Sequence, residues 1–371
     1  MRRILALDGG GIRGVFTLQI LARIEEIFRA ERQRSDLTLR DEFHFFAGTS
    51  TGAIIATCLA WGMSVREIET LYIESGPMMF ERAPWYQRWR GKYRTDPIAA
   101  TFRTKFCEDD PARSPALLGT SKLRHRGELK YLLIVMRNAS TGSPWPVSNN
   151  PDATFNDASR PDCNLHIPIW QLLRASTAAP TYFAAQTIQI GNTQHMFVDG
   201  GITPFNNPAL IAALTALLPC YRIKWPGGVD KLQVVSIGTG ITRARLTKHD
   251  AEHVTVLEQA VNVAPALMSS ISQHEDMLCR LIGDCRVGDT LDSEIGELKD
   301  EALLGDGQKK FSYVRYNREF TPSETAELYR LTGQKFALDN LQLIPFLQEK
   351  GREYAESAVH ADDILLTQAV V

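Results

Sequence analysis

Short apolar runs alternate with amphipathic stretches along the first two thirds of the chain. Apolar runs bounded by glycine, aspartate or other polar residues predict buried strands, and they occupy residues 3–7, 43–47, 129–137, 196–198 and 232–237. Apolar positions every three or four residues predict helices between them, at residues 15–32, 53–60, 169–178 and 208–218. Because strands and helices alternate, we expect an α/β fold with a mainly parallel sheet and helices on both faces.

The last third of the chain is expected to be more helical. Helical patterns cover three stretches, residues 252–282, 323–332 and 338–357. One strand-like run, residues 311–316, lies between them, and the polar stretch 138–162, rich in proline and asparagine, predicts a long loop. Because no clean linker divides the sequence, we expect one domain, with an N-terminal core in residues 1–240 and a helical extension in residues 241–371 packed on it.

The composition is that of a globular protein and excludes several classes. The 371 residues are 44% hydrophobic and 23% charged with a net charge of −2, so no basic excess indicates a nucleic-acid polymer as partner. The first apolar run ends at Asp8, too early for a signal peptide or a membrane span, which predicts a cytoplasmic protein. Histidine, cysteine and acidic residues show no metal-ligand spacing, and we expect neither a metal nor another cofactor.

The motif Gly48-Thr49-Ser50-Thr51-Gly52 joins a predicted strand to a predicted helix, with the serine at the apex of the turn. Gly48 and Gly52 allow a steep bend because they carry no Cβ. The turn would present the Ser50 hydroxyl at the edge of the sheet, beside the positive end of a helix. A nucleophilic serine is one interpretation, and a capping serine in a tight turn is the other.

A glycine-rich turn, Asp8 to Gly14, follows the first predicted strand. The amides of Gly9, Gly10 and Gly11 are free of side chains and would bind an anion at the start of the next helix. The turn lacks the Gly-Lys-Ser/Thr of a phosphate-binding loop. Beside a candidate nucleophile we favour an oxyanion hole, to which Arg13 would add a positive charge.

A nucleophilic serine needs a general base, and an aspartate is the better candidate than any histidine. The chain has eight histidines, none of them in a turn like the two above. Asp199 ends an apolar strand and is followed by Gly200 and Gly201, so its carboxylate would project at the sheet edge. Partial burial would raise its pKa into a range useful for a base, whereas the alternative is an ordinary Asp-Gly-Gly turn.

Taken together, the three motifs resemble those of the patatin-like phospholipases, in the same order and context. A fourth stretch, residues 174–183, is similar to the Ala/Ser-rich block that precedes the aspartate in that family, and the resemblance covers roughly residues 3–240. It implies a three-layer α/β/α fold and a Ser50–Asp199 dyad without histidine. It also implies that Gly9 to Gly11 form the oxyanion hole with help from Arg13.

The resemblance further implies a phospholipase A that releases fatty acids from phospholipid esters through an acyl-enzyme. A lysophospholipase or general lipid esterase is the alternative within the same chemistry. Bacterial members of the family that act in antiviral defence are gated by cyclic nucleotides, so a membrane-degrading effector with a small-molecule activator is a second alternative. No feature of this sequence identifies a nucleotide pocket.

One further segment, residues 78–94, mixes aromatic and basic side chains. From Glu81 to Arg94 it holds five basic residues and one acidic, with Trp85, Tyr86 and Trp89 among them. This mixture suits the headgroup level of a membrane, and it predicts a lid or a peripheral contact with the inner face of a membrane. A surface loop packed on the core, or a contact within a homo-oligomer, remains open as the alternative.

Overall fold

The computed structural model describes residues 1–84, 92–242, 256–301, 308–332 and 338–366. Nine strands of the described residues form one sheet: β1 (Arg2–Leu7), β2 (Phe45–Thr49), β5 (Tyr131–Asn138), β6 (Ser143–Ser148), β7 (Gln186–Ile190), β8 (Thr193–Asp199), β9 (Leu232–Ile237), β10 (Asp284–Val287) and β11 (Ser312–Tyr316). Their order is β10-β11-β9-β1-β2-β5-β8-β7, with β6 also beside β5. A separate ribbon pairs β3 (Arg124–His125) with β4 (Glu128–Leu129).

The sheet has a parallel part and an antiparallel part. All neighbouring strands from β10 to β5 pair in parallel. By contrast, β6 and β8 run antiparallel to β5, and β7 runs antiparallel to β8. The mainly parallel sheet predicted from the sequence is confirmed.

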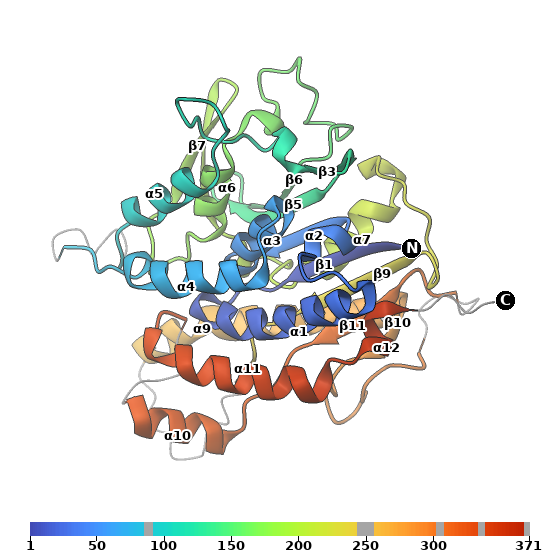
Figure 1. The fold of residues 1–371 in the computed structure, drawn as a ribbon. Helices are drawn as coiled ribbons and strands as arrows, with labels where there is room; N and C mark the ends of the chain where they lie inside the picture. The colour runs from blue at the N-terminus through green and yellow to red at the C-terminus, as the bar shows by residue number, and fades with distance from the viewer. Residues whose placement is uncertain (85–91, 243–255, 302–307, 333–337, 367–371) are drawn as a thin grey trace.

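Helices cover both faces of this sheet, which gives three layers (Figure 1). One face packs against α1 (Gly14–Arg32), α3 (Thr51–Trp61), α4 (Val65–Met79), α5 (Asp96–Lys105), α6 (Ile169–Ser176) and α11 (Ile344–Ala358). The other face packs against α7 (Ala209–Leu217) and α9 (Val256–Ile282). Strand β1 shows why both faces are filled, since Leu5 and Leu7 enter the first cluster whereas Ile4 and Ala6 enter the second. The remaining helices are α2 (Leu39–Glu42), α10 (Pro322–Thr332) and α12 (Ala361–Leu365).

The prediction of one long loop at residues 138–162 is wrong, because β6 lies within it. Residues Ser143–Ser148 pair with β5 even though Pro144 and Pro146 alternate along the strand. Proline is tolerated on a strand at the edge of a sheet, where one row of amides has no strand partner. Three further short strands, β3, β7 and β10, are also not predicted from the sequence, because their apolar patterns are short or mixed with polar residues.

The polypeptide beyond residue 240 contributes to the same sheet and the same core. It supplies β10 and β11 as well as helices, and Figure 1 shows α11 lying beside α1. Gly351 of α11 faces Phe16 and Gln19 of α1 so closely that a Cβ would collide with Gln19. Phe16 also contacts the rings of Tyr354 and Phe320, at centroid distances of 5.7 and 5.5 Å. The sheet therefore continues across the boundary that the sequence predicts at residue 240.

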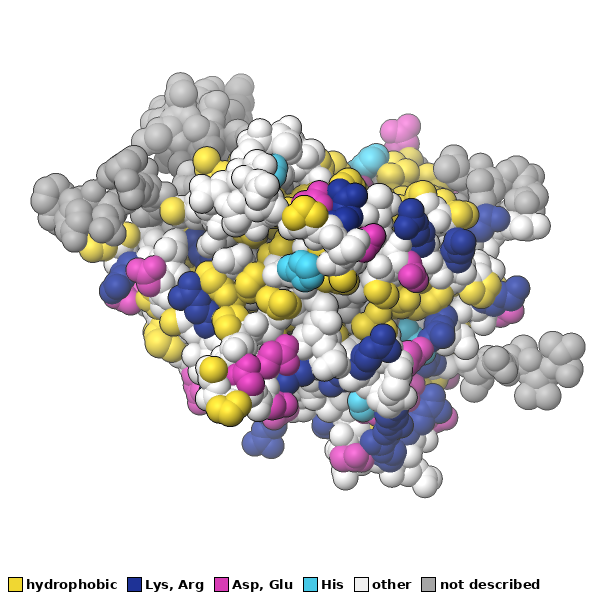
Figure 2. Space-filling model, turned by 90° about the horizontal axis from the view of Figure 1, so that it is seen from above, with side chains coloured by type: hydrophobic (Ala, Val, Ile, Leu, Met, Phe, Trp, Pro, Cys, Tyr) yellow, Lys and Arg dark blue, Asp and Glu magenta, His cyan; other side chains and the backbone are white. Residues whose placement is uncertain are grey.

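Charges of both signs are interspersed on the face of the molecule drawn in Figure 2, in keeping with a net charge of −2. Basic and acidic side chains alternate there with hydrophobic ones, so that face carries no single-sign patch suited to a nucleic-acid backbone. Within the described residues, no helix is both long and apolar enough to cross a membrane.

Candidate active site

Strands β2 and β8 meet end to end along one edge of β5. Thr49, the last residue of β2, lies opposite Val135, and Asp199, the last residue of β8, lies opposite the next residue, Met136. Strand β6 occupies the other edge of β5. Because β2 runs parallel to β5 and β8 antiparallel, the two strands point toward each other. Their ends bring Ser50 and Asp199 together although 149 positions separate them in sequence.

The turn that carries Ser50 is strained and tightly packed. Ser50 has φ 53° and ψ −121°, a backbone conformation that residues other than glycine rarely adopt. A Cβ on Gly48 would collide with the carbonyl of Gly52, and one on Gly52 would collide with the carbonyl of Leu7. The two glycines are therefore required for close packing between β1, β2 and α3, and the result is a sharp turn with the serine at its apex.

Ser176 fixes this turn from the other side. Its Oγ accepts a hydrogen bond from the Ser50 amide at 2.9 Å and donates one to the carbonyl of Val135 at 2.6 Å. Ser176 is fully buried and ends α6, within the Ala/Ser-rich block noticed in the sequence. The sequence indicates this block but no role for Ser176, because nothing in the pattern shows which hydroxyl contacts the turn that carries Ser50.

The Ser50 hydroxyl donates a hydrogen bond to Asp199 Oδ2 at 2.6 Å, and the amide of Gly201 donates one to Oδ1 at 2.7 Å. Asp199 is only 4% exposed. Burial raises the pKa of Asp199 to about 6, against the opposing effects of these two hydrogen bonds and of the Arg174 charge. A carboxylate with this pKa is ionised at neutral pH and still basic enough to accept a proton.

The glycine turn offers fewer free amides than the sequence predicts. The amide of Gly9 donates to the carbonyl of Asn206 at 3.1 Å, so this donor is already occupied. Among the described residues, the amides of Gly10 and Gly11 have no such acceptor, and Gly11, in the left-handed region at φ 59°, lines the cavity beside Ser50. The expected trio of donors is therefore reduced to Gly10 and Gly11.

Arg13 holds this turn and is not part of the cavity wall. Its Nε donates to the carbonyl of Gly10 at 3.3 Å and its Nη1 donates to the carbonyl of Gly240 at 3.1 Å. Burial lowers the pKa of Arg13 to about 10, so the side chain keeps its charge at neutral pH. Arg13 thus acts on the loop conformation more directly than on a bound anion.

A cavity of about 390 Å³ opens beside Ser50 and Asp199. Its walls are mostly apolar and come from several helices and from the segment after α6; they include Ile54, Tyr72, Phe80, Ile98, Phe183 and Met268. Of the two tyrosines that line the cavity, Tyr72 and Tyr182, the hydroxyl of Tyr72 forms hydrogen bonds with Thr51. None of the described residues lining the cavity is a histidine. A long apolar group can thus lie against the wall with its reacting end at the serine.

Trp85, Tyr86 and Trp89 lie outside the described residues. The two chain segments that lead to them are described and pair with each other, since the amide of Ala83 donates to the carbonyl of Lys92 at 3.0 Å. The amide of Lys92 donates in turn to the carbonyl of Thr181, a residue of the cavity wall, at 3.1 Å. The base of the aromatic and basic segment therefore borders the cavity.

Known proteins resemble this chain over part of its length. Curated relatives include a cGAMP-activated phospholipase of Vibrio cholerae, 32% identical over 251 residues, and one of Escherichia coli, 30% identical over 215 residues. The matches cover 64% and 57% of this chain, and 64% and 55% of those proteins. The 85/88 kDa calcium-independent phospholipase A2 of the rat is 29% identical over 252 residues, covering 64% of this chain and 27% of the rat protein.

The chain therefore spans between about half and two thirds of the length of its two bacterial relatives. Residues 5–213 match the family model described as patatin-like phospholipase. This stretch is more than half of the 371 residues and contains the glycine turn, Ser50 and Asp199. The chain belongs to the patatin-like phospholipase family.

Proposed function

We propose that the protein hydrolyses acyl esters of phospholipids with Ser50 as nucleophile and Asp199 as general base. One observation carries the proposal. A serine on a strained turn donates a 2.6 Å hydrogen bond to a buried carboxylate, beside a cavity of about 390 Å³ with mostly apolar walls. The names of the relatives, all phospholipases, support the same substrate class.

The reaction proceeds in two halves. Asp199 takes the Ser50 proton as Oγ attacks the ester carbonyl, and the amides of Gly10 and Gly11 stabilise the charge on the former carbonyl oxygen. Asp199 then returns the proton to the departing alcohol oxygen of the lysophospholipid, which leaves an acyl-enzyme. In the second half, water gives a proton to Asp199 and attacks the acyl carbon, and Ser50 leaves with that proton as the fatty acid is released.

The test is mass spectrometry of the products from diacyl phospholipids with a different chain at each position. We expect fatty acid and lysophospholipid from the wild type, and none above background from Ser50→Ala or Asp199→Asn. Cys220→Ser, at an exposed position away from the cavity, is the matched control and should keep full turnover. Turnover by either dyad variant close to that of the wild type would contradict the assignment, and a preference for monoacyl substrate would identify a lysophospholipase instead.

Access to the substrate is proposed to involve peripheral contact with the inner face of a membrane through the segment around Trp85 and Trp89. The described base of this segment borders the cavity, which supports the idea. Replacing both tryptophans by alanine should weaken binding to anionic liposomes and spare hydrolysis of a short soluble ester. An equal loss of liposome binding and of ester hydrolysis would indicate that the segment has a structural role instead.

A second candidate, a hydrolase that is inactive until a cyclic dinucleotide binds, is favoured by the two bacterial relatives named as cGAMP-activated. Here the same dyad would perform the reaction, and the ligand would only control it. Assays of the purified protein with and without a set of cyclic dinucleotides separate the two cases. Stimulation of a quiescent enzyme supports gating, whereas full activity without any ligand contradicts it.

A further inference from the structure

We propose that Arg315 is a positioning residue for the oxyanion amides, through which the C-terminal part of the chain sets the rate of the reaction. Arg315 lies on β11, about a hundred positions beyond the stretch 5–213 that matches the family model. It contacts neither the cavity nor Ser50. The inference rests on the proposed hydrolase function and adds to it a control on the glycine turn.

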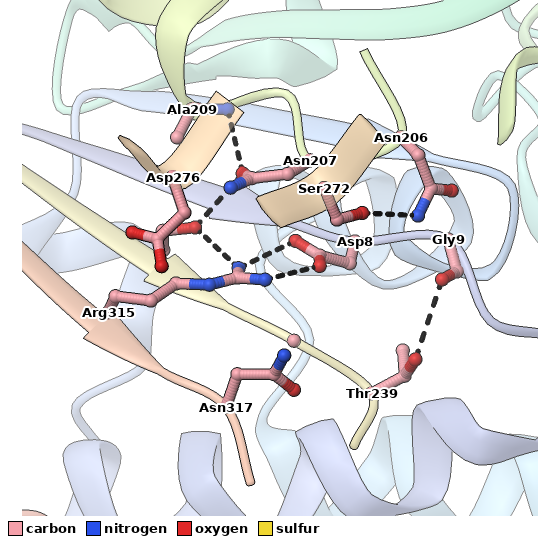
Figure 3. A network of polar contacts seen from close by, with 12 residues as sticks. Asp8, Gly9, Asn206, Asn207, Ala209, Thr239, Ser272, Asp276, Arg315 and Asn317 are labelled. Atoms are coloured by element: carbon pink, nitrogen blue, oxygen red, sulfur yellow. Dashed lines mark hydrogen bonds and ion pairs between the residues drawn. The ribbon is translucent and has the colours of Figure 1, made fainter. Parts of the chain in front are cut away.

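Arg315 and Asp8 form a buried, two-pronged ion pair. The Arg315 Nη1 donates to Asp8 Oδ1 at 2.8 Å and Nη2 donates to Oδ2 at 2.6 Å, and the two side chains are 3% and 5% exposed. Burial alone would lower the pKa of Arg315, but Asp8 raises it above its ordinary value, so the guanidinium stays charged. Figure 3 shows the pair beside Gly9. Asp8 is the first residue of the glycine turn, and the proposed donors Gly10 and Gly11 follow within three positions.

A second bond orients the guanidinium. Its Nη1 also donates to Ser236 Oγ at 2.7 Å on β9, and Ser236 donates to Asn207 Oδ1 at 3.0 Å. Asn207 Oδ1 in turn accepts the amide of Ala209 at the start of α7. The planar fork of the arginine is thus fixed by a carboxylate on one side and a hydroxyl on the other, a geometry that the flexible ammonium of lysine does not reproduce.

Two groups from later in the chain, Leu338 and Thr239, contact the rest of the glycine turn. The carbonyl of Leu338 accepts the amide of Ile12 at 2.8 Å, and a Cβ on Gly11 would collide with that carbonyl. Thr239 Oγ1 donates to the carbonyl of Gly9 at 3.4 Å (Figure 3). Of these three contacts among the described residues, only the one between Asp8 and Arg315 joins two charged groups. Arg315 is therefore the side chain whose loss should displace the turn most.

The physical reason for a rate effect is geometric. Amide donors stabilise an oxyanion only where they point at the oxygen of the tetrahedral intermediate, and a displacement of about 1 Å costs up to 10²-fold in rate. Ground-state binding depends instead on the apolar wall, which Arg315 does not contact. Loss of Arg315 should thus lower kcat and leave KM nearly unchanged.

The experiment compares Arg315→Met with Arg280→Met in the full chain. Arg280 on α9 is a matched control, because it is equally buried and pairs with Asp276 through Nε at 3.1 Å and Nη2 at 2.7 Å, but Asp276 is not part of the glycine turn. For each variant we would measure kcat and KM on a soluble ester, and the affinity for a trifluoromethyl ketone, which adds to Ser50 and places an oxyanion in the hole.

For Arg315→Met we expect kcat to fall by about 10- to 10²-fold, KM to change by less than about threefold, and affinity for the ketone to fall in parallel with kcat. Arg280→Met should lose thermal stability to a similar extent and keep its kcat. If Arg315→Met fails to fold, Arg315→Lys carries the test, with a smaller loss of the same kind because it keeps the charge but not the fork.

Equal effects of Arg315→Met and Arg280→Met on kcat, or a change confined to KM, would overturn the proposal. So would a lower kcat with unchanged affinity for the ketone, since the oxyanion amides would then be intact. Failure of the hydrolase function itself gives a different result, because the wild type would then neither turn over the ester nor form an adduct between Ser50 and the ketone.

Discussion

Two aspartates at the same edge of the sheet differ in what faces them. Asp8 follows β1 and Asp199 ends β8, and each is 4% exposed. Both oxygens of Asp8 accept hydrogen bonds from the guanidinium of Arg315. The oxygens of Asp199 accept one hydrogen bond from the Ser50 hydroxyl and one from the Gly201 amide, with no cation in contact among the described residues.

The difference shows that the partner, more than the degree of burial, decides the role of a buried carboxylate. Burial raises the pKa of Asp8 too, but the Arg315 guanidinium in contact opposes this rise, and the ion pair is a fixed attachment point for the glycine turn. Without a cation in contact, burial raises the pKa of Asp199 to about 6, which makes its carboxylate a usable base for the serine beside it. An aspartate thus holds the glycine turn after β1, whereas the aspartate at the end of β8 is the proposed base.

The largest expected effect that separates the two is on turnover. Asp199→Asn removes the proposed base and should lower kcat by about 10⁴-fold, the loss seen when the carboxylate of a catalytic triad is replaced. Asp8→Asn only loosens the glycine turn and should lower kcat by about 10- to 10²-fold, as for the loss of oxyanion donors. Steady-state kinetics of the two variants on a soluble ester at pH 8 provides the measurement. Equal losses of kcat would contradict different roles for Asp8 and Asp199.

The next effect is on stability and has opposite signs at the two positions. Asp8→Asn leaves Arg315 buried without its counter-charge and should cost about 3–5 kcal/mol in the free energy of unfolding. Asp199→Asn should raise that free energy at pH 8. The native protein favours the protonated form of Asp199, so this group adds stability below pH 3.8 and loses it as pH rises through about 6.

The increase in the free energy of unfolding expected for Asp199→Asn has an upper limit of about 3 kcal/mol, because the pKa of Asp199 is raised from 3.8 to about 6 in the folded protein. Urea unfolding of both variants and the wild type at pH 8 provides the measurement. A control at pH 4 should show a smaller gain for Asp199→Asn, since the wild-type group is then largely protonated. Destabilisation by Asp199→Asn at pH 8 would argue that its hydrogen bonds outweigh the cost of burying the charge.

The smallest expected effect concerns the pH dependence of the rate. Arg174 is 1% exposed, donates to the carbonyl of Ala184 at 2.8 Å and lowers the pKa of Asp199 through its charge. Arg174→Met should therefore move the acidic limb of the rate profile, expected near pH 6, to higher pH. The shift should be modest, because Arg174 contributes least of the four influences on that pKa. A profile that stays in place would show that the Arg174 charge does not reach Asp199.

The fold and the proposed Ser50–Asp199 pair follow in part from local signals in the sequence. Apolar runs that end at Asp8, Ser50 and Asp199 indicate that these residues project from strand ends. Ser50 and Asp199 do meet there, although β8 runs antiparallel to β5. What local signals do not contain is the pairing between distant segments. Three features depend on which distant segment lies opposite. They are the pairing of β6 with β5, the hydrogen bond between Ser176 and the Ser50 amide, and the hydrogen bond from the Gly9 amide to Asn206.

The contribution of the C-terminal third is the clearest case of this limit. Arg315 lies in a strand that the sequence does predict, residues 311–316, but nothing local shows that it faces Asp8, 307 positions earlier. The pairing becomes visible only once β11, β9 and β1 are adjacent in the sheet. In this molecule short motifs indicate the proposed reacting groups, whereas the groups proposed to orient them become visible only in the tertiary structure.

The most direct test of the proposed Ser50–Asp199 pair is the rate at which a fluorophosphonate labels Ser50 as a function of pH, with the adduct located by peptide mass spectrometry. We expect labelling of Ser50 with a rate that rises with pH and has its midpoint near 6, and almost no labelling in Asp199→Asn. Labelling at another residue, or a rate on Ser50 that is independent of both pH and Asp199, would contradict it.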